Sequence, residues 1–117
     1  MEEKKLVEFL KNAGGCVVSK NVLTGKGRVK WLLRESPVDE IDNGWRVFSD
    51  IDDDAYINNS DNLEVCDFNV IINIEPALFG IYLLSVGSDL QLLIQDGKIS
   101  FLDNKTGKKV EPLYKNE

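Results

Sequence analysis

The sequence predicts an α+β domain in which a mostly antiparallel sheet packs with an N-terminal helix and one or two short helices. Three observations support this prediction: apolar residues recur at helical spacing near the N-terminus, alternating strand patterns follow, and tight-turn signals separate neighbouring strands. Strands joined by short turns pair antiparallel, which sets the expected direction of most of the sheet.

The first two elements follow from residue spacing at the start of the chain. Leu6, Phe9 and Leu10 recur at helical spacing, so we expect a helix over Glu2–Asn12 that ends at two glycines. Cys16–Ser19 is a short apolar run bounded by polar residues, and we expect it to form a buried strand.

Two alternating segments predict the centre of the sheet. In residues 28–34 we expect Val29, Trp31 and Leu33 to face the core, which leaves a mostly basic outer face. The second segment, residues 45–49, begins with a tryptophan on the core-facing phase. We expect these segments to pair as an antiparallel unit and both tryptophans to be buried.

The C-terminal half contains stronger local signals. Asp67 is placed to cap a short helix over Phe68–Asn73. Asp96-Gly97 is a two-residue turn signal between two strand-like runs, residues 90–95 and 98–103, and it predicts a hairpin. A further turn after residue 103 predicts one more short strand before the C-terminus.

The composition excludes several function classes. The 117 residues are 43% hydrophobic, so the chain is long enough to bury a core as one domain over residues 1–117. It has no histidine, which removes histidine-based catalytic sites and histidine-ligated zinc, and we expect no enzyme, no cofactor and no metal. No long apolar segment or signal-peptide pattern is present, so we expect a cytoplasmic protein that does not bind membranes.

Negative charge is concentrated in one part of the chain. Residues 35–75 contain twelve acidic residues and one basic residue, Arg46, so their net charge is −11, whereas the remainder carries +5. One interpretation is a solvated face that aids solubility, and the other is a surface that steers and holds a basic partner. Direct nucleic-acid binding is disfavoured, because the phosphate backbone repels this charge.

The densest acidic stretch, Ser49–Asn62, is expected to be a loop. Its aspartates imitate the ligand order of an EF-hand calcium loop, but Ala55 stands where glycine is needed and Asp61 is too short to replace the bidentate glutamate. Because the resemblance to a calcium loop is only partial, a regulatory module that binds a divalent cation or a small ligand is the alternative function and not the main one. Tyr56 either anchors the loop to the core or offers an aromatic contact to a partner.

The two cysteines, Cys16 and Cys66, are expected to be buried thiols in a reducing compartment. A functional thiol pair is the minority interpretation, because neither cysteine belongs to a C-x-x-C motif.

Five segments together carry a family resemblance. They begin at Cys16, Arg34, Gly44, Asp53 and Ile71, and read CVVSKNVLxGKGxVKW, RExPVDE, GWRxFS, DDxYxNNxDN and IxNIxP. Their order and spacing resemble a family of small bacterial domains of unknown biochemical function that is grouped with the immunity proteins of polymorphic toxin systems. The resemblance covers about residues 16–88, which leaves 1–13 as a helical extension and 90–110 as C-terminal hairpins.

The resemblance implies a protein that binds and neutralises a cognate toxin domain in the cell that makes the toxin. Combined with the charge pattern, it favours a basic toxin held by an acidic surface. Asp50 and Ala55 stand where that family usually has Gly and Glu. After Ser88, Asp89-Leu90-Gln91 replaces the aromatic and charged residues that follow Gly-Ser in that family. The sequence leaves the oligomeric state open. The expected partner-binding residues are Asp39, Glu40, Asp42, Asp50, Asp52, Asp53, Asp54, Tyr56 and Asp61.

Overall fold

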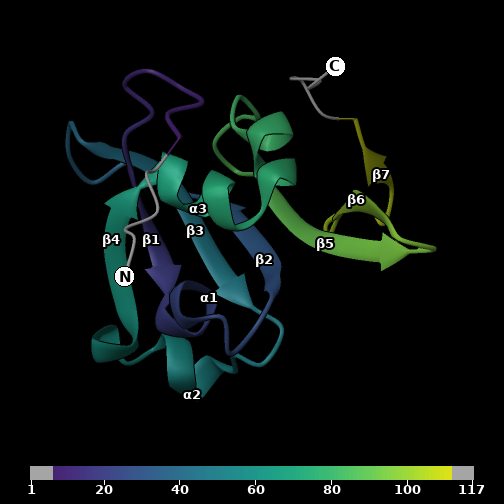
Figure 1. Ribbon diagram of the computed structural model, residues 1–117, viewed down its shortest axis with the longest axis horizontal. Helices are drawn as coiled ribbons and strands as arrows, with labels where there is room; N and C mark the ends of the chain where they lie inside the picture. Colours follow the sequence, from purple (N-terminus) through teal and green to yellow (C-terminus); the bar gives the residue numbers. More distant parts are fainter. Residues whose placement is uncertain (1–6, 112–117) are drawn as a thin grey trace.

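The computed structural model describes residues 7–111, and in this range seven strands form one sheet with short helices packed on it. Figure 1 shows the strands side by side in the order β4-β1-β3-β2-β5-β6-β7. The strands are β1 (Gly15–Ser19), β2 (Val29–Arg34), β3 (Asp42–Ser49), β4 (Leu63–Asp67), β5 (Asp89–Gln95), β6 (Lys98–Asp103) and β7 (Lys109–Val110). The helices are α1 (Lys20–Thr24), α2 (Asp54–Ile57) and α3 (Phe68–Ile74), with 3-10 turns η1 (Ser60–Asn62) and η2 (Pro76–Ile81).

The sheet is mixed, which corrects the expected mostly antiparallel arrangement. β1 and β3 pair in parallel at the centre, whereas β2 pairs antiparallel with β3 and β5, and β4 antiparallel with β1. The chain leaves β1 through α1, runs along β2, and returns through β3 into the space between β1 and β2. Each local turn reverses the chain, but β1 and β3 are two reversals apart and so run in the same direction.

The expected N-terminal helix over Glu2–Asn12 is also wrong for the part that the structure describes, because residues 7–13 form no helix. Residues 1–6 lie outside the described range. The backbone of this segment is instead bound by two asparagines of α3. Asn69 Oδ1 accepts hydrogen bonds from the backbone N–H groups of Phe9 and Leu10 at 2.9 and 3.0 Å, and Asn73 Oδ1 accepts one from Val7 at 3.1 Å. These tertiary hydrogen bonds replace the helical ones that the apolar spacing predicted.

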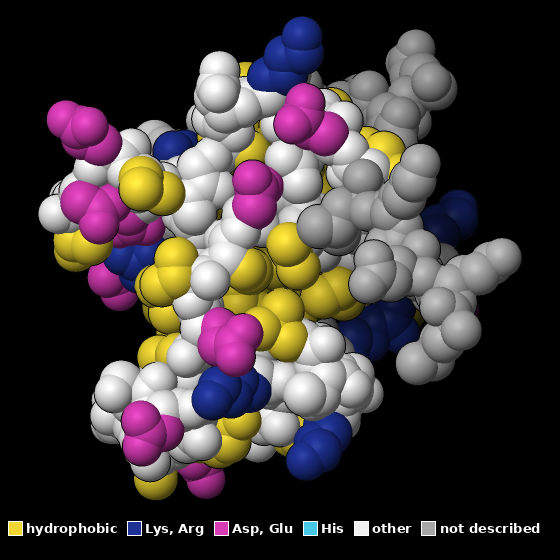
Figure 2. All heavy atoms as spheres, turned by 60° about the vertical axis from the view of Figure 1, so that its left-hand side comes forward, with side chains coloured by type: hydrophobic (Ala, Val, Ile, Leu, Met, Phe, Trp, Pro, Cys, Tyr) yellow, Lys and Arg dark blue, Asp and Glu magenta, His cyan; other side chains and the backbone are white. Residues whose placement is uncertain are grey.

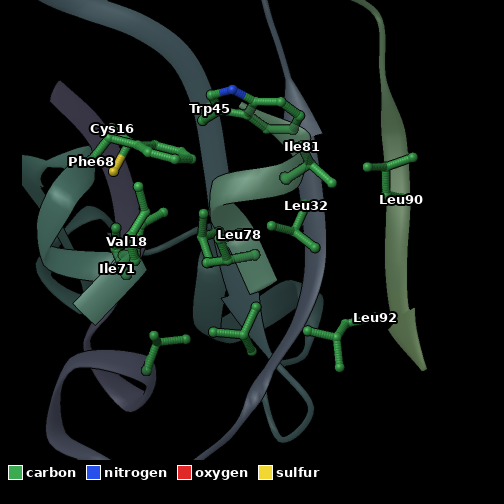
Figure 3. Packing of buried hydrophobic residues seen from close by; sticks show 14 of the residues in the cluster. Cys16, Val18, Leu32, Trp45, Phe68, Ile71, Leu78, Ile81, Leu90 and Leu92 are labelled. Atoms are coloured by element: carbon green, nitrogen blue, oxygen red, sulfur yellow. The ribbon is translucent and has the colours of Figure 1, made fainter. Parts of the chain in front are cut away.

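Helices cover one face of the sheet, and the hydrophobic core lies between these helices and the sheet. Figure 3 shows Trp45 of β3, Leu32 of β2 and Leu90 of β5 pointing toward Ile81 and Leu78 of η2. Trp45 is fully buried, as the alternation predicted, and its indole N–H donates to the backbone oxygen of residue 82 at 3.1 Å. The ring is buried and its one polar group has a hydrogen-bond partner. This packing holds the helices over the central strands.

The side chains of β2 face the opposite sides of the sheet from those that the alternation predicted. Leu32 is buried under the helices, whereas Trp31 is 37% exposed on the other face together with the half-buried Leu33. The pairing between β2 and β3 shifts register between Val29 and Trp31, so Val29 stays buried while the residues after it change phase. The outer face of β2 is therefore apolar rather than basic.

Arg34, at the end of β2, was expected to contribute to a basic outer face, but its guanidinium is bound to backbone oxygens of the protein. Its guanidinium donates to the backbone oxygens of Asn43, Tyr82 and Leu84, at 3.0, 3.1 and 2.7 Å, and lies 5.6 Å from the Trp45 ring centroid. This arginine closes one end of the core.

The local turn and capping predictions are confirmed. Asp67 caps α3 by accepting the Asn69 backbone N–H at 2.8 Å. β5 and β6 pair around Asp96 and Gly97, which have φ angles of +52° and +75°, as a two-residue hairpin requires. The strands β2 and β3 pair antiparallel as expected. Within residues 7–111 the structure has no helix of the length and apolarity that a membrane span requires.

Candidate functional site

An apolar groove of about 450 Å³ lies on the face of the sheet opposite the covering helices. Its floor is formed by the outward side chains of the two central strands, Trp31 and Leu33 of β2 and Phe48 of β3. Trp31 is the register partner of Phe48, which explains why both project to this face. Ile57 of α2 adds a fourth apolar side chain.

Four aspartates surround this apolar floor. Asp52, Asp53 and Asp54 enter from the segment that precedes and begins α2, and Asp89 enters from β5. The other lining residue is Asn104, and no lysine or arginine belongs to the lining within residues 7–111. We call this set the acidic groove: Trp31, Leu33, Phe48, Asp52, Asp53, Asp54, Ile57, Asp89 and Asn104.

The fold of the acidic segment explains how these carboxylates are positioned. Asp52 accepts hydrogen bonds from the backbone N–H of Ser49 at 2.6 Å and from the Asn21 side chain at 2.7 Å. Its partial burial acts to raise the pKa of this carboxyl, but hydrogen bonds from Ser19, Ser49 and Asn21 outweigh burial and hold the pKa below its ordinary value. Asp52 is therefore ionised and also holds the loop together.

The next two aspartates have different roles. Asp53 is the N-cap of α2, and its carboxylate accepts the Tyr56 backbone N–H at 2.8 Å. Asp54 follows as the first helical residue and is exposed. A short helix therefore stands where the sequence predicted only a loop, because Asp53 supplies a cap and Asn62 donates to the Tyr56 carbonyl at 2.9 Å.

Three of the expected partner-binding residues lie at the opposite end of β3. Asp39, Glu40 and Asp42 are in or next to the turn before β3, whereas the acidic groove lies near its end. β3 has eight residues, and eight residues of strand span roughly 25 Å. Figure 1 shows the turn before β3 and helix α2 at opposite ends of the sheet. The two acidic groups are thus separate in space.

Asp42 is already neutralised by its own chain. Both of its carboxylate oxygens accept from the Arg46 guanidinium at 2.8 Å, and the side chains are 10% and 9% exposed. This bidentate contact is the main reason that the pKa of Asp42 lies far below its ordinary value. Asp39 accepts the backbone N–H groups of Ile41 and Asp42, and so builds the turn, while Glu40 is exposed.

The three remaining expected residues, Asp50, Tyr56 and Asp61, do not line the acidic groove. Asp50 accepts the Arg28 backbone N–H at 2.9 Å and lines a separate hollow beside α1. Tyr56 is half-buried, and Asp61 is exposed in η1.

A second exposed apolar patch lies beside the turn before β3. It consists of Val38, Ile41 and Val65, which are 80%, 71% and 72% exposed, around a small hollow that Val17 also lines. Figure 2 shows hydrophobic side chains open to solvent in the middle of the β4 side of the molecule, with acidic side chains distributed around them. The hollow is lined by the Asp42–Arg46 ion pair, which compensates the charge of Asp42, and by Asp39.

The carboxylates of the acidic stretch do not converge on one point. In residues 7–111, no three acidic or cysteine side chains lie close enough together to hold a metal ion. Asp50 and Asp52 accept from different backbone groups, and Asp53 caps α2, which gives each carboxylate a separate orientation.

The apolar floor and Asp89 were missed by sequence reasoning, although one signal for the floor was present. Trp31, Leu32 and Leu33 are three consecutive apolar residues in one strand. Because successive side chains of a strand point to opposite faces, such a run must place apolar groups on both faces. Asp89 had no local signal, since its position depends on the pairing of β5 with β2.

Comparison with known proteins identifies the family. Residues 16–103 match the model of the Immunity protein Imm33 domain. This range extends past the resemblance noted in the sequence and includes both β5 and β6, and so Asp89. Searches of curated proteins and of solved structures gave no significant match. The match covers most of the chain and all the residues of the acidic groove except Asn104, and the chain belongs to the Imm33 family of immunity protein domains.

Proposed function

We propose that this protein binds and neutralises a cognate toxin domain, and that the acidic groove is the contact surface. Membership of the Imm33 family supports an immunity function in general. The observation that supports this surface is the combination of an apolar floor, with Trp31 37% exposed, and a rim of four aspartates. Exposed aromatic residues in a concave apolar site are typical anchors of protein interfaces.

The charge of the rim specifies the chemistry of the toxin surface. The partner inserts an apolar side chain between lysines or arginines that pair with Asp53, Asp54 and Asp89. Such a rim accelerates association at low ionic strength, whereas the buried anchor slows dissociation. A positively charged active cleft is a toxin surface of this kind, and its occupation by the immunity protein would block access of the substrate.

The rim is tested by the double variant Asp53→Asn and Asp54→Asn. Asparagine caps a helix as well as aspartate does, so α2 is retained. Asp52 is left intact because its carboxylate holds Ser49 and Asn21. With the cognate toxin domain as the partner, we expect the association rate constant to fall roughly tenfold at low salt, and its salt dependence to weaken.

The matched control changes two exposed acids elsewhere, Glu64→Gln in β4 and Asp96→Asn in the β5–β6 turn, and so removes the same total charge. We expect this control to change the association rate much less. Equal rate constants and salt slopes for the two double variants would contradict the assignment of the rim.

The floor is tested separately by Trp31→Ala. We expect the dissociation rate constant to rise by roughly 30-fold or more, because interface anchors of this type contribute about 2 kcal/mol or more. Leu83→Ala, which truncates a comparably exposed apolar side chain (51% exposed) outside the groove lining, is the control. An unchanged dissociation rate for Trp31→Ala would remove the groove from the interface, and neutralisation in a toxin activity assay should follow the affinity.

A further inference from the structure

The two cysteines lie directly opposite each other on neighbouring strands. The antiparallel register of β1 and β4 pairs Cys16 with Cys66. Gly14 and Phe68 lie just outside the two strands, two residues from the cysteines, and continue the same register. The Phe68 backbone N–H donates to the Gly14 oxygen at 3.0 Å, so the cysteines also form a hydrogen-bonded pair. The Cα atoms of such a pair are about 5.5 Å apart, within the range of about 4.4–6.8 Å that disulfides span. Facing residues of an antiparallel pair project to the same side, so both thiols point toward the core.

The two side chains are in contact but differ in access to solvent. Cys16 is fully buried and lies beside Phe68 (Figure 3), whereas Cys66 is half-buried at the edge of the sheet. The Cys16 thiol also donates to the Cys66 carbonyl oxygen at 3.4 Å. Both thiols are free. This arrangement provides one thiol that a reagent can reach and a second thiol directly behind it.

The contact between the two cysteine side chains separates their acidities. The interaction with Cys66, together with burial, raises the pKa of Cys16 above its ordinary value. The interaction with Cys16 lowers the pKa of Cys66, against the opposing effects of partial burial and of the Asp67 and Glu64 carboxylates. Cys66 is therefore the better nucleophile, because the thiolate is the reactive form.

We propose that Cys16 and Cys66 form a dithiol–disulfide site that is oxidised by a low-molecular-weight disulfide such as oxidised glutathione. The Cys66 thiolate attacks one sulfur of the reagent, the reagent's S–S bond breaks, and one thiolate leaves. The Cys16 thiol then loses its proton and attacks the Cys66 sulfur, which breaks the mixed disulfide and releases the second thiolate. The two cysteines lose two electrons and two protons in total, and the reagent is reduced to two thiols.

The new bond would join the edge strand β4 to β1 and close a loop that contains β2, β3 and the acidic segment. A cross-link of this length stabilises mainly by restricting the unfolded chain. We expect the melting temperature of the oxidised protein to exceed that of the reduced protein by roughly 5–15 °C.

The test is intact mass spectrometry of the full chain after incubation with oxidised glutathione, acid quenching, unfolding and alkylation with iodoacetamide. We expect a monomer that has lost two hydrogens and resists alkylation, and that regains both thiols after reduction. In Cys16→Ala, the reaction should stop at a glutathione adduct on Cys66. In Cys66→Ala, the folded protein should remain unmodified, because Cys16 is buried.

Three outcomes would overturn the proposal: a stable glutathione adduct on the wild-type protein, a disulfide-linked dimer, or two thiols that remain free while the same reagent oxidises a small dithiol. Should Cys16→Ala fail to fold, as judged by circular dichroism, the mass of the wild-type protein still decides between these outcomes.

Discussion

Replacement of Asp42 by asparagine should destabilise the fold, because it leaves Arg46 buried without its main partner. The wild-type carboxylate accepts two hydrogen bonds from Arg46 at 2.8 Å and one each from the Val38 and Gly44 backbone N–H groups at 2.9 Å. Removal of one partner of a buried ion pair costs about 3–5 kcal/mol. Glu35 lies 3.6 Å from Arg46, but it is 62% exposed and compensates little, so we expect a loss of about 3 kcal/mol.

The same variant should show a defined pH dependence. The pKa of Asp42 is lowered in the folded state, so between the unfolded and folded values the unfolded chain binds more protons and stability rises with pH. The contribution of Asp42 is complete above the ordinary pKa of about 4 and decreases as the pH falls toward the folded value. The difference between wild type and Asp42→Asn should therefore shrink by about 1 kcal/mol between pH 7 and pH 3.

Urea denaturation followed by circular dichroism at both pH values measures this difference. Asp96→Asn, in the exposed β5–β6 turn, is the control and should remain within about 0.5 kcal/mol of wild type. A loss below about 1 kcal/mol for Asp42→Asn at pH 7 would refute the reasoning on the buried pair. So would a difference that is the same at both pH values.

Two further predictions concern backbone positions outside the acidic groove. Gly44→Ala should lower the free energy of unfolding by roughly 3 kcal/mol or more, because φ is +90° and an added Cβ would lie 2.1 Å from the backbone carbonyl oxygen of Glu35. Gly25→Ala, with φ of +78° and open space around it, should cost only about 1 kcal/mol, and equal losses would contradict the role of the close approach. Asn69→Ala should accelerate hydrogen exchange at the Phe9 and Leu10 amides and cost about 2 kcal/mol; unchanged exchange would show that Asn69 does not hold this segment.

The elements that the sequence predicted correctly are those determined by neighbouring residues. Asp67 caps the helix that follows it, and Asp96-Gly97 supplies the two positive φ angles of the hairpin turn. Both signals act over a few residues, so no tertiary contact can easily override them.

The errors arose where distant residues determine the structure. The apolar spacing of the N-terminal segment is compatible with a helix, but Asn69, about sixty residues away in sequence, binds its backbone instead. The parallel pairing of β1 with β3 has no local signal, since nothing in either strand specifies its neighbour. The register shift after Val29 inverted the predicted phase of β2 and so concealed the apolar floor.

The candidate surface was predicted only in part. The charge density around Asp52, Asp53 and Asp54 was visible in the sequence, and these three residues line one groove. Sequence proximity alone placed Asp42 with them, but β3 separates it from the groove and Arg46 neutralises its charge. Charge counting cannot distinguish a carboxylate that faces solvent from one that builds a turn.

The central claim is that the acidic groove, and not the apolar patch of Val38, Ile41 and Val65, contacts the toxin. Hydroxyl-radical footprinting of the protein with and without its cognate toxin domain tests this claim directly, because both surfaces carry reactive exposed side chains. We predict strong protection of Trp31 and Ile57 in the complex and little change at Val38 and Ile41. Protection of Val38, Ile41 and Val65 with Trp31 unchanged would contradict the account.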